Sequence, residues 1–184
     1  MTNPSVTVRL SCSELLMSAQ VGVLRQALSV GRGLPDKHGI SPEDGWRAHI
    51  EGACGEFAVA KCLGVPWSGS FDTFRTDGDI LERIEIKTRS DHGYDLLVRD
   101  DDDDVRAFVL VTGIAPNYVV RGWLWGREAK QRKWRQAYAG RPTAYFVPQD
   151  ELRPLGTLLE ELKANPAVVT DHRTMYGFNP LDIS

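Results

Sequence analysis

The sequence predicts an α+β fold because of the order in which its periodic segments occur. Segments with the helical period come first, a run of short segments with the two-residue period of β-strands follows, and another helix and a last strand come after them. Of the 184 residues, 42% are hydrophobic and 26% are charged, which is typical of a globular protein. This length predicts a single domain over residues 1–184 that buries a sizeable core.

The N-terminal segments predict a short strand followed by two helices. Residues 6–10 alternate as a strand or an extended arm does. Ser11 and Glu14 have the spacing of a capping box, so a helix is expected over residues 12–30. A serine, a proline and two acids predict the start of a second helix over residues 42–63, which a glycine and a proline end.

The rest of the chain predicts mostly strands. Strand candidates lie near residues 71–75, 78–81, 84–89, 94–98, 106–112 and 117–125. A helix over 126–138, a strand over 143–147, a helix over 155–164 and a loop from residue 165 are expected after them. The five aspartates at 100–104 predict a solvated loop, because like charges in a row repel one another.

Composition restricts the cellular setting more than the activity. The three cysteines form neither a CxxC pair nor a disulfide framework, which favours a reducing cytoplasm. No apolar run approaches the ~20 residues of a membrane span, and the N-terminus lacks a signal-peptide pattern. We therefore expect a cytoplasmic protein without a membrane partner, while the net charge of -3 neither predicts nor excludes nucleic acid.

The segment Ile84–Arg89, which reads IEIKTR, carries candidate catalytic residues. Its alternation places Glu85, Lys87 and Arg89 on one face of a strand and the two isoleucines on the other. Taken alone, this pattern fits a surface strand with an ion pair as well as it fits the floor of an active site.

Acidic residues just before this strand favour the active site. A hairpin centred on Glu82 would place Asp79 opposite Glu85, and Asp77 opposite Lys87, with the Cβ atoms of each pair about 5 Å apart. Two carboxylates at that distance repel each other unless a cation lies between them, and Mg²⁺ prefers carboxylate oxygens. The turn of this hairpin lacks the glycine or asparagine that tight turns prefer.

The helix expected over residues 42–63 contributes another acid. With about 100° per residue, its apolar stripe is centred about 60° from Glu56 and about 160° from Glu51. Glu56 is therefore expected at the margin of the packed face, and Glu51 in solvent. The stripe consists of Trp46, Ile50, Ala53, Phe57 and Ala60.

These side chains together predict metal-assisted phosphoryl chemistry. A metal ion held by Asp79 and Glu85 would polarise a phosphoryl oxygen and lower the pKa of a bound water. Lys87 would orient that water or stabilise the charge that develops on the phosphate. Glu56 would hold a second metal ion or an outer-shell water.

The ordered set resembles the PD-(D/E)xK nuclease superfamily over about residues 42–138. The resemblance implies a restriction-endonuclease-like mixed β-sheet flanked by helices, with a core at about 42–147 and here an extra N-terminal helix. It also implies cleavage of phosphodiester bonds in DNA with Mg²⁺ or Mn²⁺. The residues that carry it are Glu56 in GEFAVAKCLG, Asp79 in DGDI, and Glu85 and Lys87 in IEIKTR.

The resemblance implies a role for each matched residue. Asp79 and Glu85 would be metal ligands, Lys87 the catalytic lysine, and Glu56 an auxiliary acid and metal ligand. The sequence departs from the pattern in the five residues that separate Asp79 from Glu85, which is short, so Asp77 is the alternative ligand. The chain is also similar to small phage-encoded proteins of this fold, which implies the cytoplasm of a bacterium or phage-infected cell.

A basic segment over residues 121–141, with interleaved aromatic residues, predicts contact with a phosphate backbone. The cations expected to bind nucleic acid are Arg89, Arg127, Lys130 and Lys133. Trp123 and Trp125 are expected in the core, because large aromatic residues are usually buried.

Two other kinds of function stay open on the sequence. One is a catalytically inactive protein of the same fold that serves as a nucleic-acid-binding or phage protein-interaction module. The other is a structural phage or assembly protein, and a homodimer is compatible with each of these interpretations.

Overall fold

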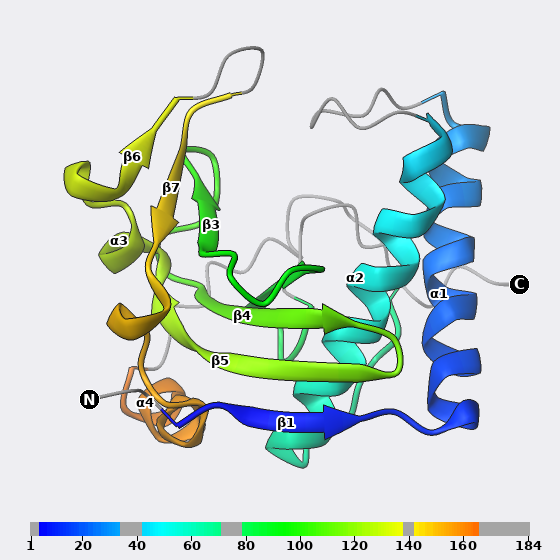
Figure 1. Cartoon of the computed structure of the whole chain (residues 1–184), viewed down its shortest axis with the longest axis horizontal. Helices are drawn as coiled ribbons and strands as arrows, with labels where there is room; N and C mark the ends of the chain where they lie inside the picture. The colour runs from blue at the N-terminus through cyan, green and yellow to red at the C-terminus, as the bar shows by residue number, and fades with distance from the viewer. Residues whose placement is uncertain (1–3, 34–41, 71–78, 138–141, 166–184) are drawn as a thin grey trace, which may run out of the picture.

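The computed structural model describes residues 4–33, 42–70, 79–137 and 142–165 and confirms the α+β class (Figure 1). The predicted strand at 71–75, the capping Ser41 and the C-terminal loop lie outside these residues, except for Asn165. In the part of the chain that is described, no helix is long and apolar enough to cross a membrane.

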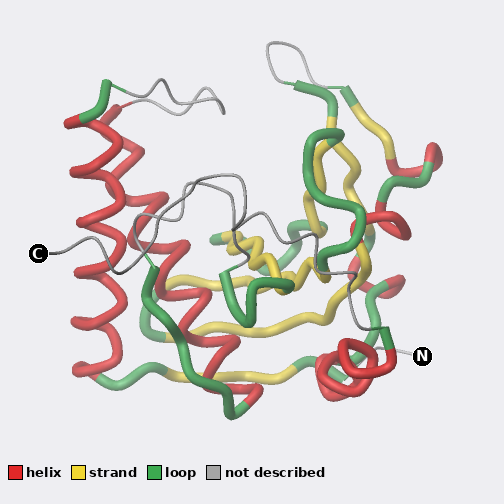
Figure 2. Tube along the Cα trace, turned by 180° about the vertical axis from the view of Figure 1, so that it is seen from behind, coloured by secondary structure: helices red, strands yellow, loops and turns green. Residues whose placement is uncertain are grey.

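Strand β1 (Val6–Arg9) leads into two long helices, α1 (Cys12–Gly31) and α2 (Pro42–Leu63). The predicted capping box begins α1: Ser11 Oγ accepts the N–H of Glu14 at 3.3 Å, and Glu14 Oε2 accepts the N–H of Ser11 at 2.7 Å. The two helices lie side by side along one flank of the molecule (Figures 1 and 2). They pack closely at Gly22, where an added Cβ would lie 2.5 Å from the Cα of Ile50.

A four-stranded mixed sheet forms the centre, in the order β1-β5-β4-β2. Strand β2 (Ile84–Arg89) is parallel to β4 (Ala107–Ile114), whereas β5 (Asn117–Trp125) is antiparallel to both β4 and β1. The predicted strand at 84–89 is thus confirmed, and it lies at the edge of this sheet.

A second, antiparallel sheet has the order β3-β7-β6. Its strands are β3 (Leu96–Arg99), β6 (Arg135–Gln136) and β7 (Ala144–Val147). This sheet stands at the opposite side of the molecule from α1 and α2 (Figure 1).

Strand β4, in the interior of the four-stranded sheet, is buried on both faces. Ile84, Val109 and Val111 pack in one core with α2 and with α4 (Leu158–Ala164), a helix that follows a 3₁₀ turn at Leu155–Thr157. Residues that alternate with them in β4 pack in a second core against the three-stranded sheet; they include Phe108 and Leu110, together with Leu96, Val98 and Val147. Because both faces of β4 are covered, this strand reads as a continuous apolar run.

The helix predicted over 126–138 is wrong. Helix α3 covers only Gly126–Ala129, and a 3₁₀ turn (Arg132–Trp134) leads from it into β6. Trp134 is 7% exposed and packs in the second core, while Arg135 and Gln136 pair with β7. Packing of this segment on the second sheet therefore outweighs its helical propensity.

Candidate active site

Glu85 and Lys87 lie on the face of β2 that belongs to the second core. In the parallel register Glu85 is beside Phe108 and Lys87 beside Leu110, and Lys87 Nζ lies 5.1 Å from the centre of the Phe108 ring. A polar cavity of about 250 Å³ opens here. Its walls are Glu85, Lys87, Arg99, Asp101, Asp102, Asp103, Arg106 and Phe108.

The predicted hairpin centre at Glu82 is confirmed. Ile80 and Ile84 exchange two backbone hydrogen bonds, of 3.2 and 3.0 Å, which is the pairing that a hairpin centred on Glu82 requires. Asp79 therefore comes next to the start of β2, and its Oδ2 accepts the N–H of Ile86 at 2.6 Å. Outside the bridge at Ile80 the predicted strand at 78–81 is not formed in its described residues, and Asp77 lies outside them.

The turn of this hairpin has an unusual backbone. Leu81 and Glu82 have φ angles of +50° and +58°, in the left-handed region that glycine or asparagine normally occupies. Each such residue costs about 1–2 kcal/mol. The sequence thus places Asp79 beside β2 through a turn that its side chains disfavour.

Replacement of Glu82 by glycine is expected to stabilise the protein by about 1 kcal/mol. Glycine adopts the left-handed conformation without steric cost, and this gain exceeds its larger loss of backbone entropy on folding. The free energy of unfolding in urea measures the effect. Glu160→Gly in the regular helix α4 should instead cost about 1 kcal/mol, and a loss of the same size in both variants would show that the turn is unstrained.

Glu56 of α2 is buried beneath α1 and the segment that follows α2. It is 4% exposed, and both of its carboxylate oxygens accept hydrogen bonds from Arg25 of α1, one of them at 2.9 Å. Trp67 Nε1 also donates to Oε2 at 3.2 Å, and Arg25 in addition donates to the backbone carbonyl of Ser70. Glu56 is therefore more buried than predicted. It was expected at the margin of the packed face, but α1 covers this side of α2.

The small residue before Glu56 brings α2 close to β2. A Cβ on Gly55 would lie 1.9 Å from Thr88 Oγ1, so only glycine allows this approach. By contrast, Gly52 has no atom within 4 Å of such a Cβ. Trp46 was predicted to lie on the apolar stripe of this helix, but it is 41% exposed, so this prediction is wrong.

Asp79 lies in the field of two other carboxylates. Burial, and then the negative charges of Glu56 and Glu85, raise the pKa of Asp79 well above its ordinary value of 3.8. The N–H of Ile86 and the Arg25 guanidinium act in the opposite direction without cancelling this shift. Asp79 is thus near enough to Glu56 and Glu85 for their charges to act on it, and Arg25, which binds Glu56, is the cation of this carboxylate cluster.

Arg25 is the positive member of this cluster. Burial disfavours its charge, but the hydrogen bonds to Glu56 and the negative charges of Glu56, Asp79 and Glu85 outweigh this effect and raise its pKa. The guanidinium thus binds one carboxylate, Glu56, and is stabilised by the charges of two others.

The free energy of unfolding is expected to fall as the pH rises through the raised pKa of Asp79. The native protein binds this proton more tightly than the unfolded chain does, so the stabilisation is complete below the unfolded pKa and is lost above the folded one. Asp79→Asn keeps an acceptor for the Ile86 N–H and should flatten the pH dependence, which urea denaturation over a pH series measures. In the control, Asp150→Asn at an exposed site, the curve should parallel the wild type; a parallel curve for Asp79→Asn would contradict the assignment.

The cations and acids of the polar cavity are paired with one another. Lys87 Nζ lies 3.2 Å from Asp102 Oδ2, and Arg106 Nη1 lies 3.2 Å from Glu85 Oε2. Asp102 also accepts the N–H of Arg99 at 2.8 Å, and its side chain is only 17% exposed. The segment 100–104 is a loop, as predicted, but Asp102 is not solvated, because it holds Lys87.

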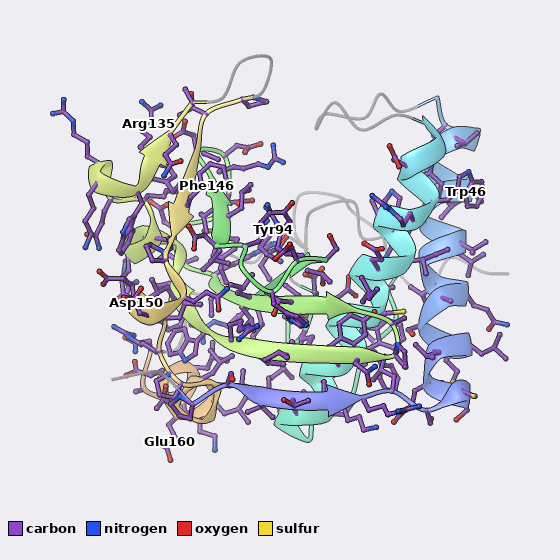
Figure 3. All side chains as sticks on the ribbon, viewed as in Figure 1. Trp46, Tyr94, Arg135, Phe146, Asp150 and Glu160 are labelled. Atoms are coloured by element: carbon purple, nitrogen blue, oxygen red, sulfur yellow. The ribbon has the colours of Figure 1, made fainter. Side chains whose placement is uncertain are left out.

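The predicted nucleic-acid contacts do not form one basic helix face. Arg89 lies over the ring of Tyr94 at 4.6 Å (labelled in Figure 3). Lys130 Nζ binds the aspartate loop, at 2.6 Å from Asp104 Oδ1. Arg127 and Lys133 lie over the rings of Trp125 and Trp134, at 5.4 and 4.3 Å.

Trp123 and Trp125 are buried, as predicted for core residues, with exposures of 0% and 2%. They contact each other edge to face with ring centroids 5.4 Å apart. The aromatic residues of the basic segment are therefore partly structural.

Asp79 and Glu85 offer carboxylate oxygens, the donors that Mg²⁺ and Mn²⁺ prefer in proteins. Burial, and then the negative charges of Glu56 and Glu85, raise the pKa of Asp79, so a cation beside it would be favourable. Among the described residues no three acidic, histidine or cysteine side chains are close enough to hold a metal ion together. Asp79 and Glu85 could thus hold an ion with water and substrate oxygens, while Glu56 as a ligand stays a prediction because Arg25 and Trp67 occupy it here.

Two residues of the site escaped the sequence analysis. Arg25 lies eleven residues after Glu14, which is about three helical turns, so both point to the same side of α1 and towards α2. The spacing of the two charged residues of α1 could therefore have indicated that Arg25 faces α2. Asp102 had none, because nothing in a run of five aspartates distinguishes the one that binds Lys87.

Comparison of the chain with protein-family models, curated protein sequences and solved structures finds no match.

Proposed function

We propose that this protein is a metal-dependent nuclease that hydrolyses phosphodiester bonds in DNA. The observation that carries the proposal is the approach of Asp79 to Glu85 and Glu56 at the edge of β2, where burial and like charge raise the pKa of Asp79. A surface strand with a simple ion pair would not place a buried carboxylate, Asp79, in the field of two others. The resemblance to the PD-(D/E)xK superfamily supports the same interpretation.

Each residue has a role that follows from its position. Asp79 and Glu85 would hold Mg²⁺ or Mn²⁺, which when bound lowers the pKa of a water and polarises a phosphoryl oxygen. Lys87 is two residues along the same strand face and would stabilise charge on the phosphate once it leaves Asp102. Glu56, fixed by Arg25, would keep negative charge behind Asp79. Arg89, beyond Lys87 on β2, would contact the DNA backbone.

A second candidate is an inactive protein of the same fold that binds nucleic acid or a phage protein. It is favoured by the internal pairing of the same side chains: Lys87 with Asp102, Glu85 with Arg106, and Glu56 with Arg25. For cleavage, each ion pair would have to break, or its residues would take no direct part in the reaction.

The two candidates are separated by incubating the purified chain with plasmid, linear duplex and single-stranded DNA. The nuclease predicts cleavage with Mg²⁺ or Mn²⁺ that EDTA stops and that Glu85→Gln removes, while Glu160→Gln on the exposed face of α4 retains it. A Tm that rises with Mg²⁺ in the wild type but not in Glu85→Gln would support the metal site independently of activity. DNA binding without cleavage at any metal concentration supports the nucleic-acid-binding form of the second candidate. Neither binding nor cleavage overturns the nuclease and leaves only the protein-interaction form.

A further inference from the structure

The polarity of helix α1 is inverted relative to a surface helix. It buries Ser18, Gly22 and Gln26 against the protein. Large apolar side chains face outward instead: Leu16 is 62% exposed, Met17 57%, Val23 41%, Leu24 45% and Val30 60%. A surface helix normally places such residues in the core and polar ones in water, so this face is built to be covered.

The outward residues have the spacing of a coiled-coil seam. Leu16, Gln20, Val23, Ala27 and Val30 follow one another at alternating intervals of four and three residues, and all five are exposed. This is the repeat with which one helix packs along another, knobs into holes. Ala27 allows close approach, and a single polar residue such as Gln20 selects one register.

Charge on α1 is restricted to its inner side. Glu14 and Arg25 are the only acidic or basic residues among the 20 of α1, and both are ion-paired across to α2, with Lys61 at 2.8 Å and with Glu56 respectively. Along α1, which the structure describes in full, the outer face thus carries no formal charge. Trp46 of α2 adds an exposed aromatic ring at the edge of the molecule beside α1 (Figure 3).

We propose that the outer face of α1 is the dimer interface of this protein, and that its occupant is α1 of a second copy. An uncharged seam cannot form ion pairs with a charged partner, whereas two copies of it can pack together without charge repulsion. The seam is also nearly symmetric about Val23, because Leu16 and Val30 lie seven residues to either side and Gln20 and Ala27 lie three and four residues away. An antiparallel pairing therefore brings Leu16 of one copy against Val30 of the other, and Gln20 close to Ala27. That is the isologous contact of a two-fold dimer. Arg25 lies on the opposite side of α1, so the pairing leaves the carboxylate cluster unchanged. The dimer proposal therefore does not depend on the proposed nuclease function.

The oligomeric state of the full chain tests the proposal. Sedimentation equilibrium should show a dimer for the wild type and a monomer for Val23→Glu, which places two carboxylates at the two-fold axis. Val105→Glu is the matched control, because Val105 is 52% exposed just before β4, at the opposite end of that strand from the hairpin that adjoins the start of α1, and it should remain dimeric. Circular dichroism verifies that each variant is folded; a monomeric wild type, or a Val23→Glu protein as dimeric as the wild type, overturns the proposal.

Cross-linking tests the direction of the pairing. In a Cys12→Ser background, Val23→Cys should form a disulfide-linked dimer on mild oxidation, and Val105→Cys should not. Leu16→Cys alone should stay unlinked, whereas Leu16→Cys mixed with Val30→Cys should link. A self-linked Leu16→Cys protein would overturn the antiparallel arrangement.

Discussion

Replacement of Lys87 by alanine is expected to lower the rate of DNA cleavage by about two to three orders of magnitude, as loss of one group that stabilises transition-state charge typically does. Lys87 is the cation that shares the strand face of Glu85 and lines the same polar cavity. Its side chain is 20% exposed and its partner Asp102 is 17% exposed, so the variant should also lose about 1–3 kcal/mol of stability by leaving Asp102 without its cation. Single-turnover cleavage at saturating protein measures the chemical step.

Two further variants decide whether the lysine itself is responsible. Asp102→Asn breaks the same ion pair but keeps the ammonium group, so it should retain cleavage, whereas Lys87→Ala should not. Lys163→Ala, an exposed lysine of α4, should be indistinguishable from the wild type. If Asp102→Asn and Lys87→Ala lose activity equally, the ion pair and not the ammonium group is what matters. Cleavage by Lys87→Ala at the wild-type rate would remove this residue from the site.

Most of the fold was predictable because its signals are local. The capping box at Ser11 and Glu14 predicted the start of α1, and alternation predicted β2 at its observed bounds. The segment after β5 was mispredicted for the opposite reason. Its basic residues suit a helix, but Trp134 has to reach the second core, and only the distant strand β7 makes that position favourable.

The candidate site was predictable where a single hairpin determines it. The register between Ile80 and Ile84 followed from counting about Glu82, even though the turn lacks glycine. Contacts between distant segments were not predictable in this way. Glu56 was expected to be half-solvated, because the wheel of α2 contains no information about the helix that covers it.

The second large effect is expected at Arg25. Arg25→Met should destabilise the protein by about 3–5 kcal/mol, the usual cost of leaving one partner of a buried ion pair without the other. Methionine replaces the apolar stem of the side chain but not the two hydrogen bonds to Glu56, which is 4% exposed. The loss falls at the upper end of this range if Asp79 and Glu85, whose charges also act on Arg25, stay ionised. Urea denaturation at pH 7 measures it, and the loss is a large part of the ~5–15 kcal/mol that stabilises a typical domain.

The matched variant is the double replacement Arg25→Met and Glu56→Gln. Glutamine is uncharged and still offers an oxygen to Trp67 Nε1, so most of the lost stability should return. Arg47→Met on the exposed side of α2, where the guanidinium is 72% exposed, should cost less than about 0.5 kcal/mol. A double variant as unstable as Arg25→Met would mean that the packing of the arginine stem, and not the charge of Glu56, makes Arg25 necessary. In that case added Mg²⁺ should not relieve the destabilisation of Arg25→Met, whereas a loss caused by the unpaired charge of Glu56 should shrink when Mg²⁺ is added.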